Sequence, residues 1–168
     1  MSNPFDPEWT ASFDSARFRQ VLGHFPTGVT VVTAMSTDGP IGLSIGSFSS
    51  LSLDPPLVLF CAGRTSTTWP RIRDVGAFCV NILAEDQEDI CRVFAGRGTD
   101  KFAGIGWRPS LVGAPQLHGC LASLDCRVDE VHEGGDHDIV IGRVLDLELH
   151  RQGGPLVFFR GGYGRFAP

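Results

Sequence analysis

The pattern of apolar and polar positions predicts three helices. Residues 12–25 repeat apolar side chains with the spacing of one helix face, and either Ser12 or Ser15 can cap the start of this helix. The repeating side chains are Phe18, Val21, Leu22 and Phe25. Residues 66–75 and 86–95 predict two shorter helices, the second of which gathers its apolar residues on one side.

Most of the remaining chain has the pattern of β-strands. Residues 27–35 and 41–48 are rich in β-branched and apolar side chains and flank the turn signal Asp38-Gly39, so they predict a hairpin. Residues 121–132 and 139–150 alternate apolar and polar side chains across a glycine-rich turn, which predicts a second antiparallel hairpin. Further strands are predicted at 57–61, after the rigid break Asp54-Pro55-Pro56, at 77–83 and at 156–159.

Many short strands, few helices and no repeated alternation of strand and helix indicate a single, mainly β domain with flanking helices. The expected architecture is an antiparallel β-barrel, closed or nearly closed, with the helix of residues 12–25 packed against its outside. We expect a tail at residues 1–11 and one domain at residues 12–168. Residues 96–117 are rich in Gly, Pro and Trp without a clear period, and are expected to form a long surface loop.

Length and composition fit one globular domain, because 168 residues with 42% hydrophobic and 20% charged positions can build a single core. The formal net charge of −5 and the scattered basic residues argue against a nucleic-acid binder, which needs clustered Lys and Arg. No apolar run reaches the roughly 18 residues of a membrane span, and the N-terminus lacks the pattern of a signal peptide. We therefore expect a cytoplasmic protein that binds neither membrane nor nucleic acid.

Motifs for metal binding and for nucleophilic catalysis are missing from the sequence. The five cysteines form no close C-x-x-C pair, so neither a disulfide framework nor a zinc knuckle is indicated. The group His132, Asp136, His137 and Asp138 surrounds a single turn without a second set of ligands, so we predict no metal site. The sequence also contains no G-x-S-x-G nucleophile motif and no P-loop, so a cofactor would have to supply any chemistry.

Two tracts of small residues fit a flat ligand that carries a phosphate. Residues 42–50 combine glycine with serine, and glycine in a strand lets a ligand approach the backbone. Residues 64–68 place hydroxyl groups just before a predicted helix, where hydroxyls and free amides suit a phosphate. Each tract also has an ordinary structural explanation, a solvent-exposed strand for the first and a helix cap for the second.

The order of these tracts resembles that of the flavin reductase family, which is built on the FMN-binding split barrel. The resemblance extends from Phe18 to Tyr163, and no single segment decides it. The segments that carry it are, in order, Phe25–Thr33, Asp38–Gly39, Gly42–Ser50, Asp54–Val58, Phe78–Leu83, Asp100–Gly104, Gly135–His137 and Phe158–Tyr163. The chain is most similar to the small reductase components that supply reduced flavin to separate monooxygenases.

The resemblance implies a homodimer that takes up FMN or FAD, accepts hydride from NADH or NADPH, and delivers reduced flavin to a partner monooxygenase. It implies no catalytic side chain, because the protein needs only to align the two rings and to exclude water. The residues implied for flavin, with the two threonines at its phosphate, are Pro40, Ile41, Gly42, Leu43, Ser44, Gly46, Ser47, Cys61, Ala62, Gly63, Thr67 and Thr68. Those implied for the nicotinamide nucleotide are His137, Phe158, Phe159, Arg160, Gly161 and Tyr163.

Three alternatives stay open, and two positions depart from the family pattern. A non-enzymatic flavin carrier on the same barrel would leave residues 136–137 and 158–163 without a role, and a pyridoxamine-phosphate-oxidase-like enzyme would need more basic residues around its phosphate. The third alternative is an ordinary β-barrel interaction domain that binds no ligand. Gly46 stands where many relatives carry a larger polar residue. Val93 stands where close relatives can have arginine, so any contact with the flavin phosphate there has to come from the backbone.

Overall fold

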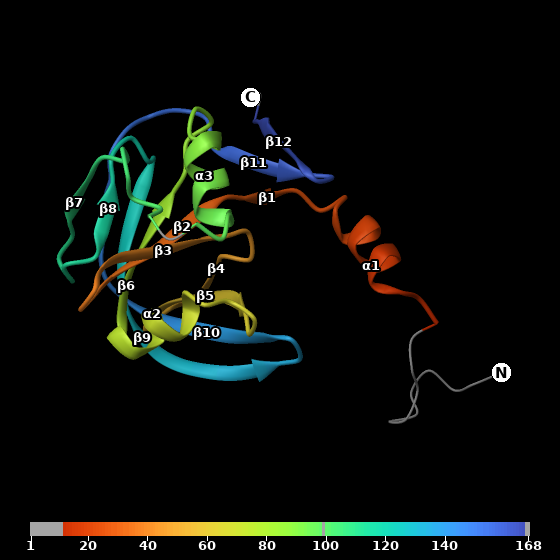
Figure 1. Ribbon diagram of the computed structural model, residues 1–168, viewed down its shortest axis with the longest axis horizontal. Helices are drawn as coiled ribbons and strands as arrows, with labels where there is room; N and C mark the ends of the chain where they lie inside the picture. The colour runs from red at the N-terminus through yellow and green to blue at the C-terminus, as the bar shows by residue number, and fades with distance from the viewer. Residues whose placement is uncertain (1–11, 99, 167–168) are drawn as a thin grey trace.

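A seven-stranded sheet forms the body of the molecule (Figure 1). The computed structural model describes residues 12–98 and 100–166, so the expected tail at residues 1–11 lies outside the described part. The strand order is β3-β2-β6-β9-β10-β5-β4, and every neighbouring pair is antiparallel. These strands are β2 (Thr30–Ser36), β3 (Gly39–Ile45), β4 (Ser49–Leu53), β5 (Pro56–Gly63), β6 (Ala77–Ile82), β9 (Ala122–Gly134) and β10 (His137–Leu149).

The sheet curves around one apolar core. Leu43 of β3, at one edge of the sheet, shares this buried core with Phe60 of β5, near the other edge, and with Phe78 of the central strand β6. Phe60 packs edge-to-face on Phe78 with ring centroids 5.5 Å apart. The predicted mainly β, antiparallel class is therefore confirmed, whereas the edge strands β3 and β4 do not pair with each other within residues 12–98 and 100–166.

Two small sheets flank the main one. β1 (Thr27–Gly28), β11 (Leu156–Phe159) and β12 (Gly162–Arg165) form a three-stranded sheet, whose last strand the sequence pattern did not predict. β7 (Trp107–Pro109) pairs with β8 (Pro115–Leu117), so the expectation of a long surface loop over residues 96–117 is wrong at these strands. The hairpin is fixed by the buried side chain of Asn81, which accepts the backbone N–H of Leu117 at 2.7 Å.

Two of the three helices pack against the main sheet. α2 (Trp69–Val75) buries Ile72, and α3 (Glu88–Ala95) buries Phe94. α2 begins three residues later than predicted, because the hydroxyl of Ser66 accepts the N–H groups of Thr68 and Trp69 and forms a turn ahead of the helix. No helix in the described part of the chain is long and apolar enough to cross a membrane.

The first helix lies where the sequence predicts it, but it does not pack as expected. α1 (Ser15–Leu22) is capped by Asp14, whose carboxylate accepts the N–H of Arg17 at 2.8 Å, and not by Ser12 or Ser15. All residues of α1 are exposed, and the helix stands apart from the sheet (Figure 1). The expectation that it packs against the outside of the barrel is therefore wrong for the single chain. Amphipathic spacing predicts an apolar face without specifying what covers it.

Candidate functional site

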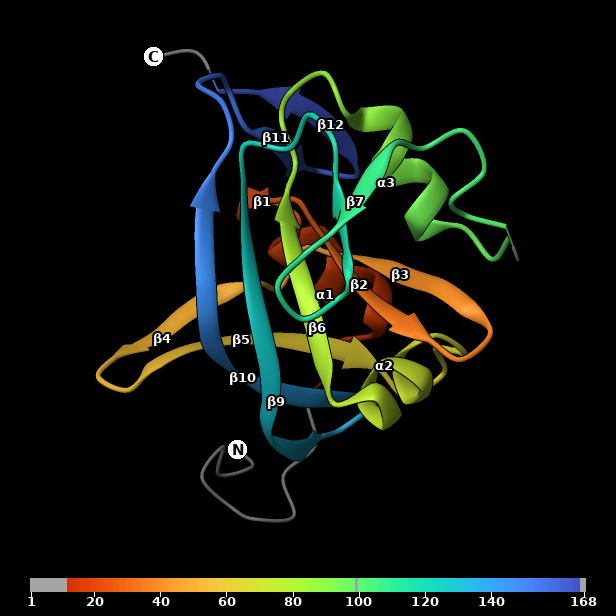
Figure 2. The same ribbon diagram turned by 90° about the vertical axis from the view of Figure 1, so that its left-hand side faces the viewer.

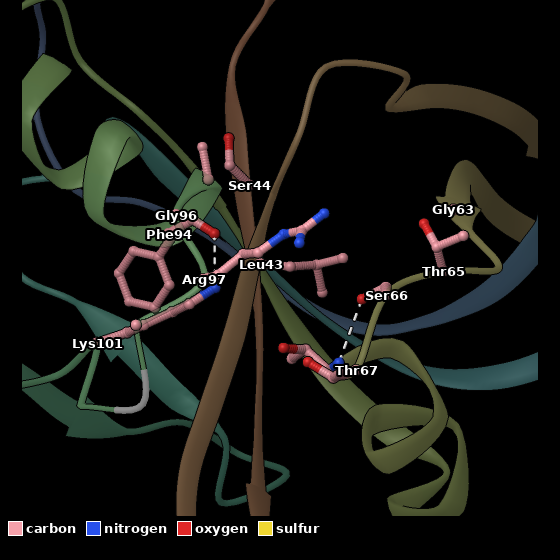
Figure 3. A pocket seen from close by; sticks show the side chains of 13 residues that line it. Leu43, Ser44, Gly63, Thr65, Ser66, Thr67, Phe94, Gly96, Arg97 and Lys101 are labelled. Carbon is pink, nitrogen blue, oxygen red and sulfur yellow. Dashed lines mark hydrogen bonds between the residues drawn. The ribbon is translucent and has the colours of Figure 1, made fainter.

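One cavity, which we call the first, has a volume of about 560 Å³ and lies between β3, the end of β5 and the segment after α3 (Figure 3). Leu43 and Ser44 contribute its wall from β3, and Gly63 contributes the wall from β5. Thr67 and Thr68, just ahead of α2, line it as well. Its volume is within the range of roughly 300–1,000 Å³ that is typical of small-ligand pockets.

A second cavity of about 370 Å³ adjoins the first. Pro40, Ile41 and Gly42 of the residues implied for flavin line this second cavity and not the first. The residues that line both cavities, and that we call the shared wall, are Thr67, Thr68, Arg97, Gly98 and Lys101.

Two cations of the shared wall were not among the predicted site residues. Lys101 donates from Nζ to the backbone carbonyl of Phe94 at 2.9 Å and lies 3.5 Å from the carbonyl oxygen of Gly42. Burial lowers the pKa of Lys101. Arg97 is exposed beside it. The one sequence signal for this placement is the segment Asp100–Gly104, which belongs to the family resemblance.

The hydroxyls of Thr67 and Thr68 lie opposite these cations without serving as helix caps. Ser66 accepts the backbone N–H of Thr68 at 3.2 Å and that of Trp69 at 3.1 Å, so Ser66 satisfies the start of α2. Figure 3 shows Ser66 and Thr67 on one side of the cavity and Lys101 on the other. Hydroxyl donors and cations on facing walls can bind an anionic group such as a phosphate.

A third cavity of about 820 Å³ lies between the connection from β3 to β4 and the small C-terminal sheet. Gly46 and Ser47, implied for flavin, line it together with Phe158 and Gly161, implied for the nicotinamide nucleotide. The structure therefore brings members of both predicted sets together. Most of the remaining wall is apolar and includes Phe18 of α1.

A row of hydrogen bonds connects the first cavity with the C-terminal sheet. The buried Sγ of Cys91 in α3 lies 3.2 Å from Ser44 Oγ and 3.2 Å from Tyr163 Oη. Tyr163 also packs against the ring of Phe158, with centroids 5.3 Å apart. Burial and the bond to Cys91 raise the pKa of Tyr163 to about 12. Cys91 is buried in α3, and the sequence pattern gives no signal for this polar contact.

The titration of Tyr163 tests this row. It is the only tyrosine in the chain, so phenolate absorbance of the whole protein reports its ionisation. We expect the transition near pH 12 in the parent. In Cys91→Ala it should move toward the ordinary value of 10 without reaching it, because burial is the larger cause and remains. The neutral phenol stabilises the fold below pH 10, and this contribution is lost as the pH rises from 10 to 12. An unmoved transition in the variant would contradict the contact.

His137 lies beside Gly63, which lines the first cavity. It opens β10 opposite Gly63 of β5, and a Cβ atom built on Gly63 would lie 3.7 Å from His137 Nε2. Its Nδ1 is 2.7 Å from the carboxylate of Asp136, and this hydrogen bond lowers the pKa of Asp136. The segment Phe158–Tyr163 lies at the opposite end of the molecule (Figures 1 and 2). Within one chain, the structure therefore does not bring His137 together with the other residues implied for the nucleotide.

The other predicted residues play mainly structural parts. Ser47 Oγ accepts the N–H of Cys61 at 2.9 Å and donates to its carbonyl at 3.2 Å, so this hydroxyl is held from both sides. Ala62 is fully buried in the core and can offer only backbone atoms to a ligand. Phe159 packs on His24, and the N–H of Arg160 donates to the carbonyl of Gly23 at 2.9 Å, which ties the C-terminal sheet to the end of α1.

The glycine tract of β3 is only partly a ligand surface. A Cβ atom at Gly42 would lie 2.8 Å from the ring of Phe94, so glycine is needed there to let α3 pack against the strand. At Gly46 the nearest atom to such a Cβ is Thr27 Oγ1 at 3.4 Å, an ordinary contact, so this position tolerates a larger residue. The departure from the family pattern at Gly46 thus leaves extra space in the third cavity.

The cavities fit a small domain that binds nucleotides, with cations and hydroxyls for a phosphate and an apolar space for flat rings. The flavin reductase like domain family matches residues 22–167, and the chain belongs to this family. The resemblance found in the sequence is therefore confirmed. The chain is 49% identical over 157 residues to the reductase subunit HsaB of a flavin-dependent monooxygenase from Rhodococcus jostii, covering 94% of this chain and 80% of that protein.

Solved structures of similar proteins agree with this assignment. The structure of nitrilotriacetate monooxygenase component B from Mycobacterium thermoresistibile matches with a TM-score of 0.89 at 49% identity, covering 91% of this chain and 87% of that chain. The NADH:FAD oxidoreductase SgcE6 from Streptomyces globisporus, solved in complex with NAD and FAD fragments, matches with a TM-score of 0.88 at 38% identity. That match covers 96% of this chain and 98% of that chain.

Proposed function

We propose that this protein is an NAD(P)H-dependent flavin reductase that transfers hydride from a reduced nicotinamide nucleotide to FMN or FAD. The observation that carries the proposal is the third cavity, where Gly46 and Ser47 of the flavin set and Phe158 and Gly161 of the nucleotide set line one space. The reductase activities named for its relatives support the same reaction. A non-enzymatic flavin carrier would not need the residues implied for the nicotinamide nucleotide.

The shared wall is the proposed site of the flavin phosphate. Lys101 and Arg97 supply positive charge, and Thr67 and Thr68 supply hydroxyl donors around the same point. Close relatives can carry an arginine at the position of Val93. In this chain the positive charge comes instead from Arg97 and Lys101, in the segment after α3. The named relatives are flavin reductase components, so they give no support to a pyridoxamine-phosphate-oxidase-like activity.

The chain's own residues contribute alignment and shielding to the proposed reaction. When bound, flavin would supply N5 as the acceptor of hydride from C4 of a reduced nicotinamide. The apolar lining of the third cavity would exclude water from flat rings that bind there. Two hydroxyl dipoles are fixed by hydrogen bonds, that of Ser47 to the backbone of Cys61 and that of Ser44 to Cys91. Fixed dipoles of this kind would stabilise the negative charge added to a reduced flavin. We assign no catalytic side chain.

The test mixes the purified protein with FMN or FAD and with NADH or NADPH, and follows the loss of nucleotide absorbance. We expect oxidation of at least one nucleotide, with a rate that depends on the presence of flavin. A protein that binds flavin and oxidises neither nucleotide would be a carrier, and the proposal would be wrong. Addition of a flavin-dependent monooxygenase then tests delivery, which the names of the relatives as monooxygenase reductase components support.

We further propose that residues 12–168 form one split-barrel domain. Its support is the curvature of the seven-stranded sheet, which brings Ile45 of one edge strand and Val58 of the strand next to the other edge into one buried cluster. We also propose a cytoplasmic location. The five cysteines are free thiols, which a reducing compartment preserves.

Exposed apolar residues support a homodimer. Leu53 of β4 is 95% exposed, and Leu147 and Leu149 of β10 are 68% and 81% exposed. In the described residues, β10 beyond Arg143 pairs with β9 alone, which leaves its other edge open to a second chain. Exposed apolar surface of this extent typically marks a protein interface. The apolar face of α1 is a further surface that a partner can cover.

Sedimentation of a charged variant tests the dimer. Leu147→Asp should convert a dimer into a monomer, because an unpaired carboxylate in an apolar interface is costly. Leu111→Asp is the matched control, since Leu111 is 71% exposed on the loop between β7 and β8. It should sediment like the parent. A parent that sediments as a monomer at micromolar concentration would contradict the proposal.

A further inference from the structure

We propose that Cys91 is a positioning residue that couples the two ligand sites, because its thiol links Ser44 in the wall of the first cavity with Tyr163 in the sheet that lines the third. A ligand in one cavity then favours a ligand in the other. This inference rests on the proposed function, in which flavin lies against Ser44 and the nicotinamide nucleotide against Phe158. It adds the residue through which each ligand acts on the other.

The thiol of Cys91 is the only hydrogen-bond partner that two hydroxyls have within residues 12–98 and 100–166. Its Sγ lies 3.2 Å from Ser44 Oγ and 3.2 Å from Tyr163 Oη. A thiol can donate one hydrogen bond and accept another, so Cys91 can serve both hydroxyls at once. Cys91 is 2% exposed, so water does not reach the sulfur to take the place of either hydroxyl. The orientation of the Ser44 hydroxyl therefore depends on that of Tyr163.

Tyr163 in turn is packed behind the wall of the third cavity. Its register partner across β11 and β12 is Phe158, which lines the third cavity and whose ring centroid lies 5.3 Å from that of Tyr163. On the same ring, Cζ of Arg92 lies 4.9 Å from the centroid, and Glu88 holds this guanidinium through its Nε at 2.9 Å. The phenol is thus fixed between an aromatic ring and a cation. A ligand that orders Phe158 therefore acts on the phenol hydroxyl as well.

Two physical effects make the coupling favourable. The hydroxyls and the thiol lose rotational freedom when a ligand fixes them, and the ligand that binds second finds them already ordered. A hydrogen bond in a buried chain also polarises the next one, so a flavin that accepts a hydrogen bond from Ser44 strengthens the row as far as Tyr163. By thermodynamic reciprocity, flavin and nucleotide raise each other's affinity by the same factor.

The experiment measures the dissociation constants of FMN and FAD by quenching of flavin fluorescence, with and without the oxidised nicotinamide nucleotide, which donates no hydride. Inhibition of the steady-state reaction first establishes the nucleotide concentration that saturates its site. The ratio of the two dissociation constants is the coupling factor. We expect a factor of roughly three to ten in the parent, the equivalent of one hydrogen bond. Cys91→Ala should bring this factor close to one, and Cys91→Ser should restore most of it, because a hydroxyl also donates and accepts.

Two further variants distinguish the hydrogen bonds from packing. Tyr163→Phe keeps the aromatic ring beside Phe158 and removes only the hydroxyl, so it should also bring the coupling factor close to one. Cys120→Ala is the matched control, because Cys120 is fully buried and lines none of the three cavities. Its thiol donates to the backbone carbonyl of Leu117 at 3.1 Å, away from the row. This variant should keep the coupling factor of the parent.

The outcomes separate this inference from the proposed function. A coupling factor of one in the parent, or a factor that Cys91→Ala and Tyr163→Phe leave unchanged, would overturn the inference, while flavin-dependent oxidation of the nucleotide still supports the reductase. A Cys91→Ser variant that behaves like Cys91→Ala would also overturn it, because the effect would then come from volume and not from hydrogen bonding. If Cys91→Ala does not fold, the factor in Tyr163→Phe decides. A protein that binds flavin and oxidises neither nucleotide would refute the proposed function itself.

Discussion

Valine at both Thr67 and Thr68 should weaken flavin binding about ten-fold or more, because hydrogen bonds to a charged group contribute roughly 1.5–3 kcal/mol each. The two hydroxyls line both cavities at the proposed phosphate position. The fold should survive the change, since Ser66 caps α2 and valine keeps the branched shape of threonine. Flavin fluorescence quenching measures the affinity, and circular dichroism verifies the fold.

Thr37→Val serves as the control for this double variant. Thr37 is exposed in the turn between β2 and β3 and does not line any of the three cavities. Its replacement should leave flavin affinity unchanged. Riboflavin, which lacks the phosphate, should bind the double variant and the parent equally. If the double variant binds FMN and FAD as the parent does, the phosphate lies elsewhere.

His137→Ala should raise the KM for the reduced nucleotide by roughly two- to ten-fold, the equivalent of one hydrogen bond of about 0.5–1.5 kcal/mol. The imidazole lies beside Gly63, which lines the first cavity, and Asp136 holds its Nδ1, so that Nε2 is left for a ligand. The fall in kcat should be smaller, because an orienting contact acts on the ground state and the transition state alike. Steady-state kinetics with saturating flavin measure both parameters.

His132→Ala is the matched control for this histidine. His132 is exposed on the adjacent strand β9, where its Nε2 lies 2.8 Å from the carboxylate of Glu130. Its loss should leave KM and kcat unchanged. If His137→Ala keeps the wild-type KM and kcat, His137 has no role in binding the nucleotide. If the variant instead raises the dissociation constant for flavin, His137 contacts the flavin and not the nucleotide.

The strands were predictable because their signals are local. β9 and β10 alternate apolar and polar residues around a glycine turn, and the structure pairs them in that register. The pair β7 and β8 was not predictable, since its support comes from Asn81, a residue outside the segment. The exposure of the apolar face of α1 was also not predictable. Periodicity identifies an apolar face but does not indicate which element packs against it.

The same distinction applies to the site. The small-residue tracts identified Ser44 and Thr67 by their own composition, and both line the first cavity. Lys101 was missed because its place in the shared wall depends on how the chain returns over β3 after α3. The polar contacts of Cys91 could not be predicted, because its partners Ser44 and Tyr163 lie 47 and 72 residues away in the sequence.

The chain contains one lysine, and that side chain lies in the wall where the first two cavities meet. Burial lowers the pKa of Lys101, so a larger share of its amine is uncharged and nucleophilic at a given pH than for a lysine in water. An acylating reagent would therefore find a single side-chain amine in the whole protein, at the proposed phosphate position. A phosphate bound there would block the reaction, so the yield of acylation at this one residue would count the unoccupied sites.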